Sequence, residues 1–226
     1  YHGENPAWGV RLPEMKRREL HALNFEQARQ VLARLPNPAK EMALLSMTAS
    51  LNVGEMLALR WKRVNLTSDP TVSEGELLPP YSLAVRENYY DGVFGSVKAS
   101  TRRRIVPLPP MVVETLAAHR ASSLHPNPDD IVFCSRNGKP KNERNLLRRA
   151  LKPAGEALGM PWLSWHVFRR THATFGEQIG MALSDRQAQM GHSGPRMTLH
   201  YTQSDLSRRR GSVDAIAERL RQGNAA

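Results

Sequence analysis

Residues 165–201 read WHVFRRTHATFGEQIGMALSDRQAQMGHSGPRMTLHY, and this stretch decides how the rest of the chain is interpreted. It contains His166, Arg169, His192 and Tyr201. Arginine and histidine side chains can hold a phosphate group, and a tyrosine hydroxyl can attack one. The stretch therefore suggests a phosphate site, to which the upstream sequence would bring further groups.

His166 and Arg169 lie three residues apart at the start of an expected helix. Side chains at this spacing share one helix face, and the N-terminus of a helix favours negative charge. The pair could therefore bind one anion together. A buried histidine next to a solvated arginine is the alternative, and it is the commoner explanation of an isolated HxxR pattern.

The second part of the stretch is a GHS sequence around His192, followed by Gly194 and Pro195. The Gly-Pro pair is expected to end one helix and begin another, because proline suits the first helical position. Tyr201 follows in that second helix. A tyrosine with its ring in the core is the alternative for this single position.

The composition predicts a globular chain with a polyanionic partner. The 226 residues are 40% apolar, enough for one sizeable domain, and 32 basic against 21 acidic residues give a net charge of +11. Nucleic acid is the first candidate partner; solubility alone or a membrane surface are the alternatives. Cys134 is the single cysteine, which rules out an internal disulfide and a cysteine-based metal site and fits a reducing, cytoplasmic environment.

No apolar run approaches the roughly 20 residues that span a bilayer, so no membrane partner is expected. The N-terminus lacks the layout of a signal peptide. The chain begins with Tyr1 rather than Met, which suggests a piece of a longer protein.

The hydrophobic pattern predicts a mainly α fold with a small antiparallel β-sheet (α+β). Residues 1–22 form a linker or arm, and 23–226 form one domain. Asn24 and Gln27 predict a capping box for the first helix. Alternating residues predict strands over 81–85 and 105–106, joined through a basic loop over 97–103. Further helices are expected over 39–51, around 56–59, and over 112–120, 143–158, 167–179, 184–190, 195–201 and 212–222.

Four boxes in this order resemble the tyrosine recombinases, or phage-type integrases. WHVFRRTHAT is similar to that family's HxxRHT box, and MGHSGPRMTLHY is similar to its LGHS…Tyr box. VKASTRRRIVPL resembles its lysine hairpin, and ASLNVGEMLALRW resembles its first box, TGLRxxELLxLxW. The resemblance implies a DNA breaking-rejoining fold, with the family's N-terminal core-binding domain missing before residue 23.

The resemblance also implies a role for each site residue. Tyr201 would attack the scissile phosphate and form a 3′-phosphotyrosyl link. Lys98 would protonate the departing 5′-oxygen, and His166 would assist proton transfer. Arg169 and His192 would hold the nonbridging oxygens. Resealing would then need no metal, ATP or other cofactor.

The first box departs from the family pattern, because Asn52 stands where the family has its first catalytic arginine. Asparagine cannot make the charged, two-pronged contact. Losing such an arginine costs on the order of 10³-fold or more in rate. Arg60 would lie about 12 Å away along a helix, so the 102–104 run or a partner molecule is the more reasonable source of another cation.

Three functions therefore remain open. The first is a site-specific recombinase that cuts and rejoins double-stranded DNA. The second is a DNA-binding relative that cleaves slowly or not at all because of Asn52. The third is an unrelated basic helical protein, for example a nucleoid binder.

For DNA, a basic face is expected that contacts mainly phosphates and includes Lys98, Arg102, Arg103, Arg169 and Arg170. Resemblance to the family implies a tetramer in synapsis on DNA and a location in the cytoplasm, associated with the nucleoid. Residues 212–226 could pass to a neighbouring subunit or fold back in cis. Without DNA, a monomer is expected.

Overall fold

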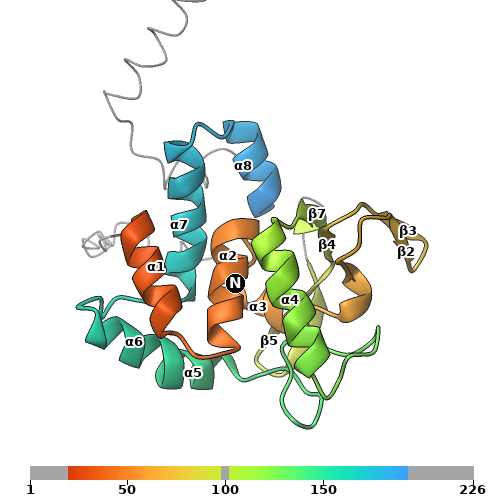
Figure 1. Ribbon diagram of the computed structural model, residues 1–226, viewed down its shortest axis with the longest axis horizontal. Helices are drawn as coiled ribbons and strands as arrows, with labels where there is room; N and C mark the ends of the chain where they lie inside the picture. Colours follow the sequence, from red (N-terminus) through yellow and green to blue (C-terminus); the bar gives the residue numbers. More distant parts are fainter. Residues whose placement is uncertain (1–19, 98–101, 193–226) are drawn as a thin grey trace, which may run out of the picture.

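The computed structural model describes residues 20–97 and 102–192. Helices surround a central helix, and small antiparallel sheets lie on one side (Figure 1). The predicted fold class, mainly α with a small antiparallel sheet, is confirmed. The helices are α1 (Phe25–Arg34), α2 (Ala39–Ala49), α3 (Val53–Ala58), η1 (Trp61–Arg63), α4 (Pro110–Ser122), α5 (Glu143–Leu146), η3 (Leu147–Leu151), α6 (Lys152–Ala157), α7 (Trp165–Gln178) and α8 (Leu183–Met190).

The first helix begins as the sequence predicts. The Asn24 side chain accepts a hydrogen bond from the Gln27 N–H at 2.8 Å, and the Gln27 side chain accepts from the Asn24 N–H at 3.0 Å. This capping box satisfies backbone donors that a helix start leaves without partners. Just before it, the Leu23 N–H donates to Thr171 Oγ1 at 2.9 Å, which joins the start of α1 to α7.

Helix α2 is the centre of the domain and contacts α1, α4 and α7 (Figure 1). Nearly every side chain on it is buried, as expected for a mostly apolar helix in the middle of a domain. Its one buried carboxylate, Glu41, pairs with His119 Nδ1 of α4 at 2.8 Å. Burial acts to lower the pKa of His119, but the bonds to Glu41 and to the Val132 carbonyl raise that pKa above its ordinary value.

The predicted pair of strands is confirmed as β4 and β7, which belong to a three-stranded antiparallel sheet in the order β1-β4-β7. Leu83 lies opposite Val106, and Val85 lies opposite Arg104. This register places Arg104 at the end of the sheet nearest α8, which contacts β7. The strands are β1 (Val64–Asn65), β2 (Thr71–Ser73), β3 (Glu76–Leu78), β4 (Ser82–Val85), β5 (Glu87–Tyr90), β6 (Val93–Ser96) and β7 (Arg104–Pro107).

Two short hairpins, β2–β3 and β5–β6, are additions that the sequence analysis did not predict. The second turns at Asp91 and Gly92, with φ of 48° and 85°. Positive φ at both turn positions is typical of tight hairpins, and an Asp-Gly pair is a strong signal for one. Gly54 of α3 lets β5 come close, because a Cβ atom there would lie 2.9 Å from the Tyr89 carbonyl oxygen.

The remaining helices differ from the predictions in detail. The expected helix over 143–158 is divided into α5, the π-helical segment η3 and α6. Pro153 follows the π segment, and a proline ring cannot sit over the carbonyl of the residue four before it in a regular α-helix. The expected helices over 195–201 and 212–222, and the arm up to residue 19, lie outside the described residues.

No helix within 20–97 and 102–192 is both long enough and apolar enough to cross a membrane.

Candidate active site

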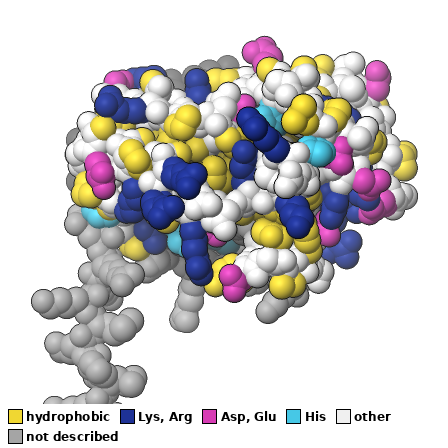
Figure 2. Space-filling model, turned by 90° about the horizontal axis from the view of Figure 1, so that it is seen from below, with side chains coloured by type: hydrophobic (Ala, Val, Ile, Leu, Met, Phe, Trp, Pro, Cys, Tyr) yellow, Lys and Arg dark blue, Asp and Glu magenta, His cyan; other side chains and the backbone are white. Residues whose placement is uncertain are grey.

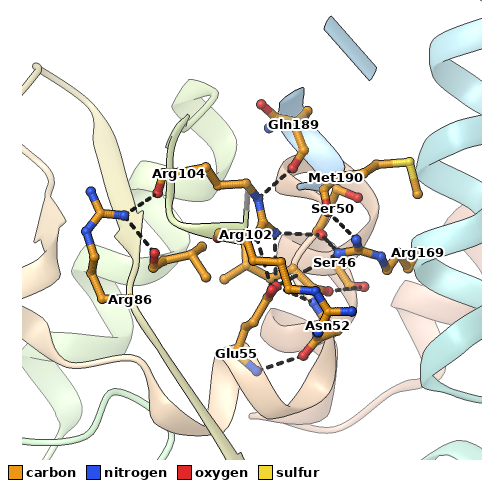
Figure 3. Close-up of polar contacts among 12 residues, drawn as sticks. Ser46, Ser50, Asn52, Glu55, Arg86, Arg102, Arg104, Arg169, Gln189 and Met190 are labelled. Atoms are coloured by element: carbon orange, nitrogen blue, oxygen red, sulfur yellow. Dashed lines mark hydrogen bonds and ion pairs between the residues drawn. The ribbon is translucent and has the colours of Figure 1, made fainter. Parts of the chain in front are cut away.

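The centre of the candidate site is a buried ion pair between Glu55 of α3 and Arg104 of β7. Arg104 Nη1 lies 3.0 Å from Glu55 Oε1, and Arg104 Nη2 lies 2.9 Å from Glu55 Oε2 (Figure 3). Their side chains are only 2% and 6% exposed, respectively. A fork-shaped guanidinium matched to both carboxylate oxygens is the strongest common geometry for such a pair.

Arg104 also ties three backbone segments together. It donates to the carbonyl oxygens of Gln189 at 2.8 Å, Ser50 at 3.3 Å and Arg102 at 3.1 Å (Figure 3). It therefore joins the ends of α2 and α8 to its own strand. With these bonds in place, Arg104 is a structural arginine and not the spare cation that the 102–104 run was expected to offer.

Arg169 reaches the same centre from α7, which is where the sequence predicted a phosphate-binding arginine. Its guanidinium donates to the carbonyl oxygens of Ser50 and Met190 (Figure 3). Its Nη1 lies 3.9 Å from Glu55 Oε2, and the side chain is 17% exposed. Two carbonyls and a carboxylate thus fix the direction of this guanidinium before any ligand arrives.

Ser50 can serve both arginines because α2 ends there in a left-handed turn, with φ of 58° and ψ of 30°. The turn leaves the Ser50 carbonyl outside the helix hydrogen bonds, so that Arg104 and Arg169 can both donate to it. Ser46 supports the turn by donating from its hydroxyl to the Leu51 carbonyl at 2.8 Å.

Asn52 is the N-cap of α3 and has a structural task there. Its side-chain oxygen accepts from the Glu55 N–H at 2.8 Å, and its own N–H donates to Glu55 Oε2 at 3.0 Å. Asparagine is among the best N-cap residues, whereas arginine cannot accept this bond. Asn52 therefore fixes the carboxylate of Glu55 but supplies no charge of its own.

His192 follows directly after α8, whose end is capped by Gly191 in the left-handed conformation. The His192 N–H donates to the Gln187 carbonyl at 3.1 Å. Burial, together with the charges of Arg169, Arg104 and Arg102, lowers the pKa of His192 from 6.5 to about 4. His192 is thus neutral at physiological pH in the free protein and can still donate one hydrogen bond to a phosphate.

His166 and Arg169 have different surroundings, although they share one face of α7 as predicted. His166 is exposed in the first turn of the helix, and Arg169 is half-buried. Their joint action on one anion stays a prediction. Arg170, the neighbouring DNA-binding candidate, is half-buried, with its Nε atom inside the protein.

Arg102 and Arg103 are both exposed, and they directly precede β7. Arg103 lines a cavity of about 500 Å³ together with Arg63, Arg86 and Glu74. The hydrogen bond from Arg86, with the charges of Arg63 and Arg103, holds the pKa of Glu76 below its ordinary value. The positive charge of Arg102 instead helps to lower the pKa of His192.

Arg60, the other arginine of the first box, is engaged elsewhere. It donates to Glu87 Oε2 at 3.2 Å and to the Asp129 carbonyl at 2.7 Å, and it lies over the Phe94 ring. Arg60 therefore does not replace the arginine missing at position 52. Its distance along the sequence from Asn52 had already argued against such a replacement.

His172 is a residue of the site region that sequence reasoning missed. Its Nδ1 lies 3.0 Å from the Met47 carbonyl, so it joins α7 to α2. Burial lowers the pKa of His172, and the charge of Arg169 lowers it further. The available signal was its position three residues after Arg169, on the same helix face.

Lys98 and Tyr201, the predicted general acid and nucleophile, lie outside the described residues. Among the residues that are described, no group of three or more His, Cys, Asp or Glu side chains could hold a metal ion.

A mainly helical domain with this site has the fold of tyrosine recombinase catalytic domains. The structure of the Tn1549 transposon integrase in complex with a circular intermediate DNA matches with a TM-score of 0.71 at 17% identity, over 89% of this chain and 68% of that one. The crystal structure of XerA recombinase matches with a TM-score of 0.63 at 20% identity, over 92% of this chain and 70% of that one.

The sequence profile of the phage integrase family matches residues 21–208, and the chain therefore belongs to this family. The integrase of Mycobacterium phage L5 is 25% identical over 206 residues, which are 89% of this chain and 53% of that protein. A XerC-like tyrosine recombinase of Caldanaerobacter subterraneus subsp. tengcongensis is 24% identical over 236 residues, covering 96% of this chain and 60% of that protein. The chain thus spans between half and three fifths of these relatives.

Proposed function

We propose that this chain is the catalytic domain of a site-specific recombinase that cuts and rejoins double-stranded DNA through Tyr201. The observation that carries the proposal is the arrangement of Arg169, held by two carbonyls beside the Glu55–Arg104 pair, with His192 at the end of the neighbouring helix. Membership of the phage integrase family supports the same function.

In the proposed reaction, the Tyr201 oxygen attacks the scissile phosphorus. A bond forms between phosphorus and this oxygen, the bond to the 5′-oxygen breaks, and Lys98 gives a proton to the departing oxygen. His166 takes up the proton of the tyrosine hydroxyl. Rejoining is the reverse reaction, in which a 5′-hydroxyl attacks the phosphotyrosine. The energy of the phosphodiester bond is kept in the covalent link, so neither step calls for a cofactor.

The described residues would stabilise the charge that develops on the phosphate. Arg169 would donate to a nonbridging oxygen, and neutral His192 would donate to another. Because Arg169 is already fixed in the free protein, little reorganisation is needed when DNA binds. Glu55 and Arg104 would act as positioning residues that never touch the DNA.

The surface charge supports a double-stranded DNA partner. On the face shown in Figure 2, Lys and Arg side chains are spread across the surface among apolar ones, with a group of acidic side chains near one edge. Together with the net charge of +11, this favours binding to DNA phosphates over a broad area.

Action on DNA would place the protein at the nucleoid. A tetramer on paired DNA sites and a monomer without DNA belong to the proposal, and light scattering with and without DNA would test them.

Covalent trapping tests the cleavage activity. The probe is a nicked duplex that the protein itself selects from a random-sequence pool, 5′-labelled on the strand to be cut, with a nick a few nucleotides 3′ of the cleavage site. Cleavage releases the short 3′ fragment and leaves labelled DNA on the protein in denaturing gels.

The expected result is an adduct with the natural chain and none with Tyr201→Phe. If the natural chain binds the duplex and forms no adduct, the protein is a cleavage-deficient DNA-binding relative, the alternative that Asn52 favours.

A further inference from the structure

Arg102 is an exposed arginine two residues before Arg104 of the buried Glu55–Arg104 pair. Arg104 Nη1 donates to the Arg102 carbonyl at 3.1 Å. Arg104 is itself fixed by both carboxylate oxygens of Glu55. The backbone of Arg102 is therefore anchored directly to the centre of the site, although its side chain is exposed.

The side chains of Arg102 and Arg103 have different surroundings. Arg102 lies in a turn just before β7, and the strand itself begins at Arg104. Arg103 lines the cavity beside Arg63 and Arg86. In Figure 3 the side chain of Arg102 extends across the Glu55–Arg104 pair towards Asn52.

The guanidinium of Arg102 is also available. Within 20–97 and 102–192 it makes no hydrogen bond or ion pair, and the side chain is exposed. Arg60 and Arg86 differ, because they are bonded to Glu87 and Glu76 respectively. The charge of Arg102 nevertheless contributes to the lowered pKa of His192. Arg102 is therefore close enough to interact electrostatically with His192, which is predicted to bind the phosphate.

The charge at the site shows why a further cation matters. Glu55 offsets one of the two inward arginines, Arg104 and Arg169, while His192 is neutral at physiological pH. The centre thus has one net positive charge. A phosphodiester has one negative charge and gains more as the pentacoordinate state forms, and fixed donors are most effective against such developing charge. Arg102 adds the second positive charge that Asn52 does not supply.

We propose that Arg102 takes the place of the family's first catalytic arginine, donating from its guanidinium to a nonbridging oxygen of the scissile phosphate while Arg169 donates to another. The arginine would then come from the turn just before β7 and not from the start of α3, which Asn52 caps. Arg102 would act through its charge and its hydrogen bonds and would transfer no proton. This inference rests on the proposed function and assigns a further catalytic residue to it.

Two matched variants test the assignment, Arg102→Gln and Arg103→Gln. Both remove one positive charge from neighbouring exposed positions, so both weaken the general attraction to DNA. Adduct formation on the selected nicked duplex is followed in single turnover with all DNA bound. We expect Arg102→Gln to react about 10²-fold more slowly than Arg103→Gln, the loss typical of a removed transition-state donor. Equal rates in the two variants would overturn the assignment.

A second comparison asks whether position 52 and position 102 serve the same phosphate. Asn52→Arg is introduced into the natural chain and into Arg102→Gln. Two groups that replace each other give non-additive effects. We expect the new arginine to accelerate Arg102→Gln by at least about 10-fold more than it accelerates the natural chain. The same factor in both backgrounds would contradict the proposal, provided that both proteins keep the same melting temperature.

The outcomes separate this inference from the function on which it rests. If neither the natural chain nor Arg103→Gln forms an adduct that depends on Tyr201, both proposals fail. If the natural chain forms that adduct and Arg102→Gln matches Arg103→Gln, the recombinase function stands and the role of Arg102 is wrong.

Discussion

The carboxylate of Glu55 and the guanidinium of Arg104 form a two-pronged ion pair, at 3.0 and 2.9 Å, inside the protein. The pair connects α3 to β7 across 49 residues of sequence. Arg169 approaches the same carboxylate at 3.9 Å. The site is therefore assembled around a structural ion pair, and the groups proposed to touch DNA are arranged beside it.

Breaking this pair should destabilise the protein strongly. Glu55→Gln or Arg104→Met leaves a charged partner buried, and we expect each to lower the free energy of unfolding by about 3–5 kcal/mol. Urea denaturation provides the measurement. The double variant Glu55→Leu/Arg104→Met should lose less than the sum of the single changes, because no uncompensated charge remains. Strictly additive losses would show that the two groups are not coupled.

The N-cap role of Asn52 gives a separate stability prediction. Asn52→Ala should lower the free energy of unfolding by about 1 kcal/mol, while Asn52→Ser should keep most of it, since a hydroxyl oxygen can accept the Glu55 N–H. Asn24→Ala, in the matching capping box of α1, is the control and should lose a similar amount. Thermal unfolding of the three variants measures these losses of stability. Equal stability of the alanine and serine variants at position 52 would be evidence that Asn52 does not cap α3.

Much of the scaffold could be predicted because its signals are local. Asn24 and Gln27 lie three residues apart, and they form the capping box that their types indicate. The alternation over 81–85 predicts β4, and the short run of Ile105 and Val106 predicts its partner β7. The β5–β6 hairpin was missed although Asp91 and Gly92 are its characteristic turn residues, because its strands carry few buried side chains.

The interior of the site was harder to predict, because its contacts join distant residues. The sequence indicated Arg169 and His192 by their spacing in residues 165–201. It gave no indication that Arg104 turns inward to Glu55 while Arg102 stays exposed. That difference depends on the register of β7 against β4, which is set by tertiary packing.

The pKa of His192 gives a test that needs no DNA. Arg169, Arg104 and Arg102 face it with positive charge and Glu55 with negative charge, and burial acts in the same direction as the arginines. In the folded protein we expect a pKa of about 4 by NMR titration. Arg102→Gln should raise this pKa, and Arg103→Gln should raise it less. An ordinary value near 6.5 in the natural chain would contradict the described surroundings.

The sign of the stability effect follows from that lowered pKa. Between pH 6.5 and about 4 the unfolded chain binds a proton at His192 that the folded protein does not. His192 therefore destabilises the fold progressively as the pH falls through this window. His192→Gln should remove this contribution, so the variant should lose less stability than the natural chain between neutral and mildly acidic pH.

Binding to DNA should depend strongly on salt, because the expected contacts are to phosphates. The logarithm of the binding constant should fall linearly with the logarithm of salt concentration, with a slope of about −0.9 for each phosphate contacted. Arg102→Gln should make this slope less steep by about one such contact. Fluorescence anisotropy with a labelled duplex gives the slope. An affinity that hardly changes between low and moderate salt would contradict a phosphate-contacting interface.

The most direct test of the central claim is to identify the residue that carries the DNA. The protein is trapped on the selected nicked duplex, digested with nuclease and trypsin, and analysed by tandem mass spectrometry. We predict that the tryptic peptide MTLHYTQSDLSR, residues 197–208, carries a residual nucleotide on Tyr201 through its 3′-phosphate. A nucleotide attached to any other residue, or no attached nucleotide in a protein that binds the duplex, would contradict DNA cleavage through Tyr201.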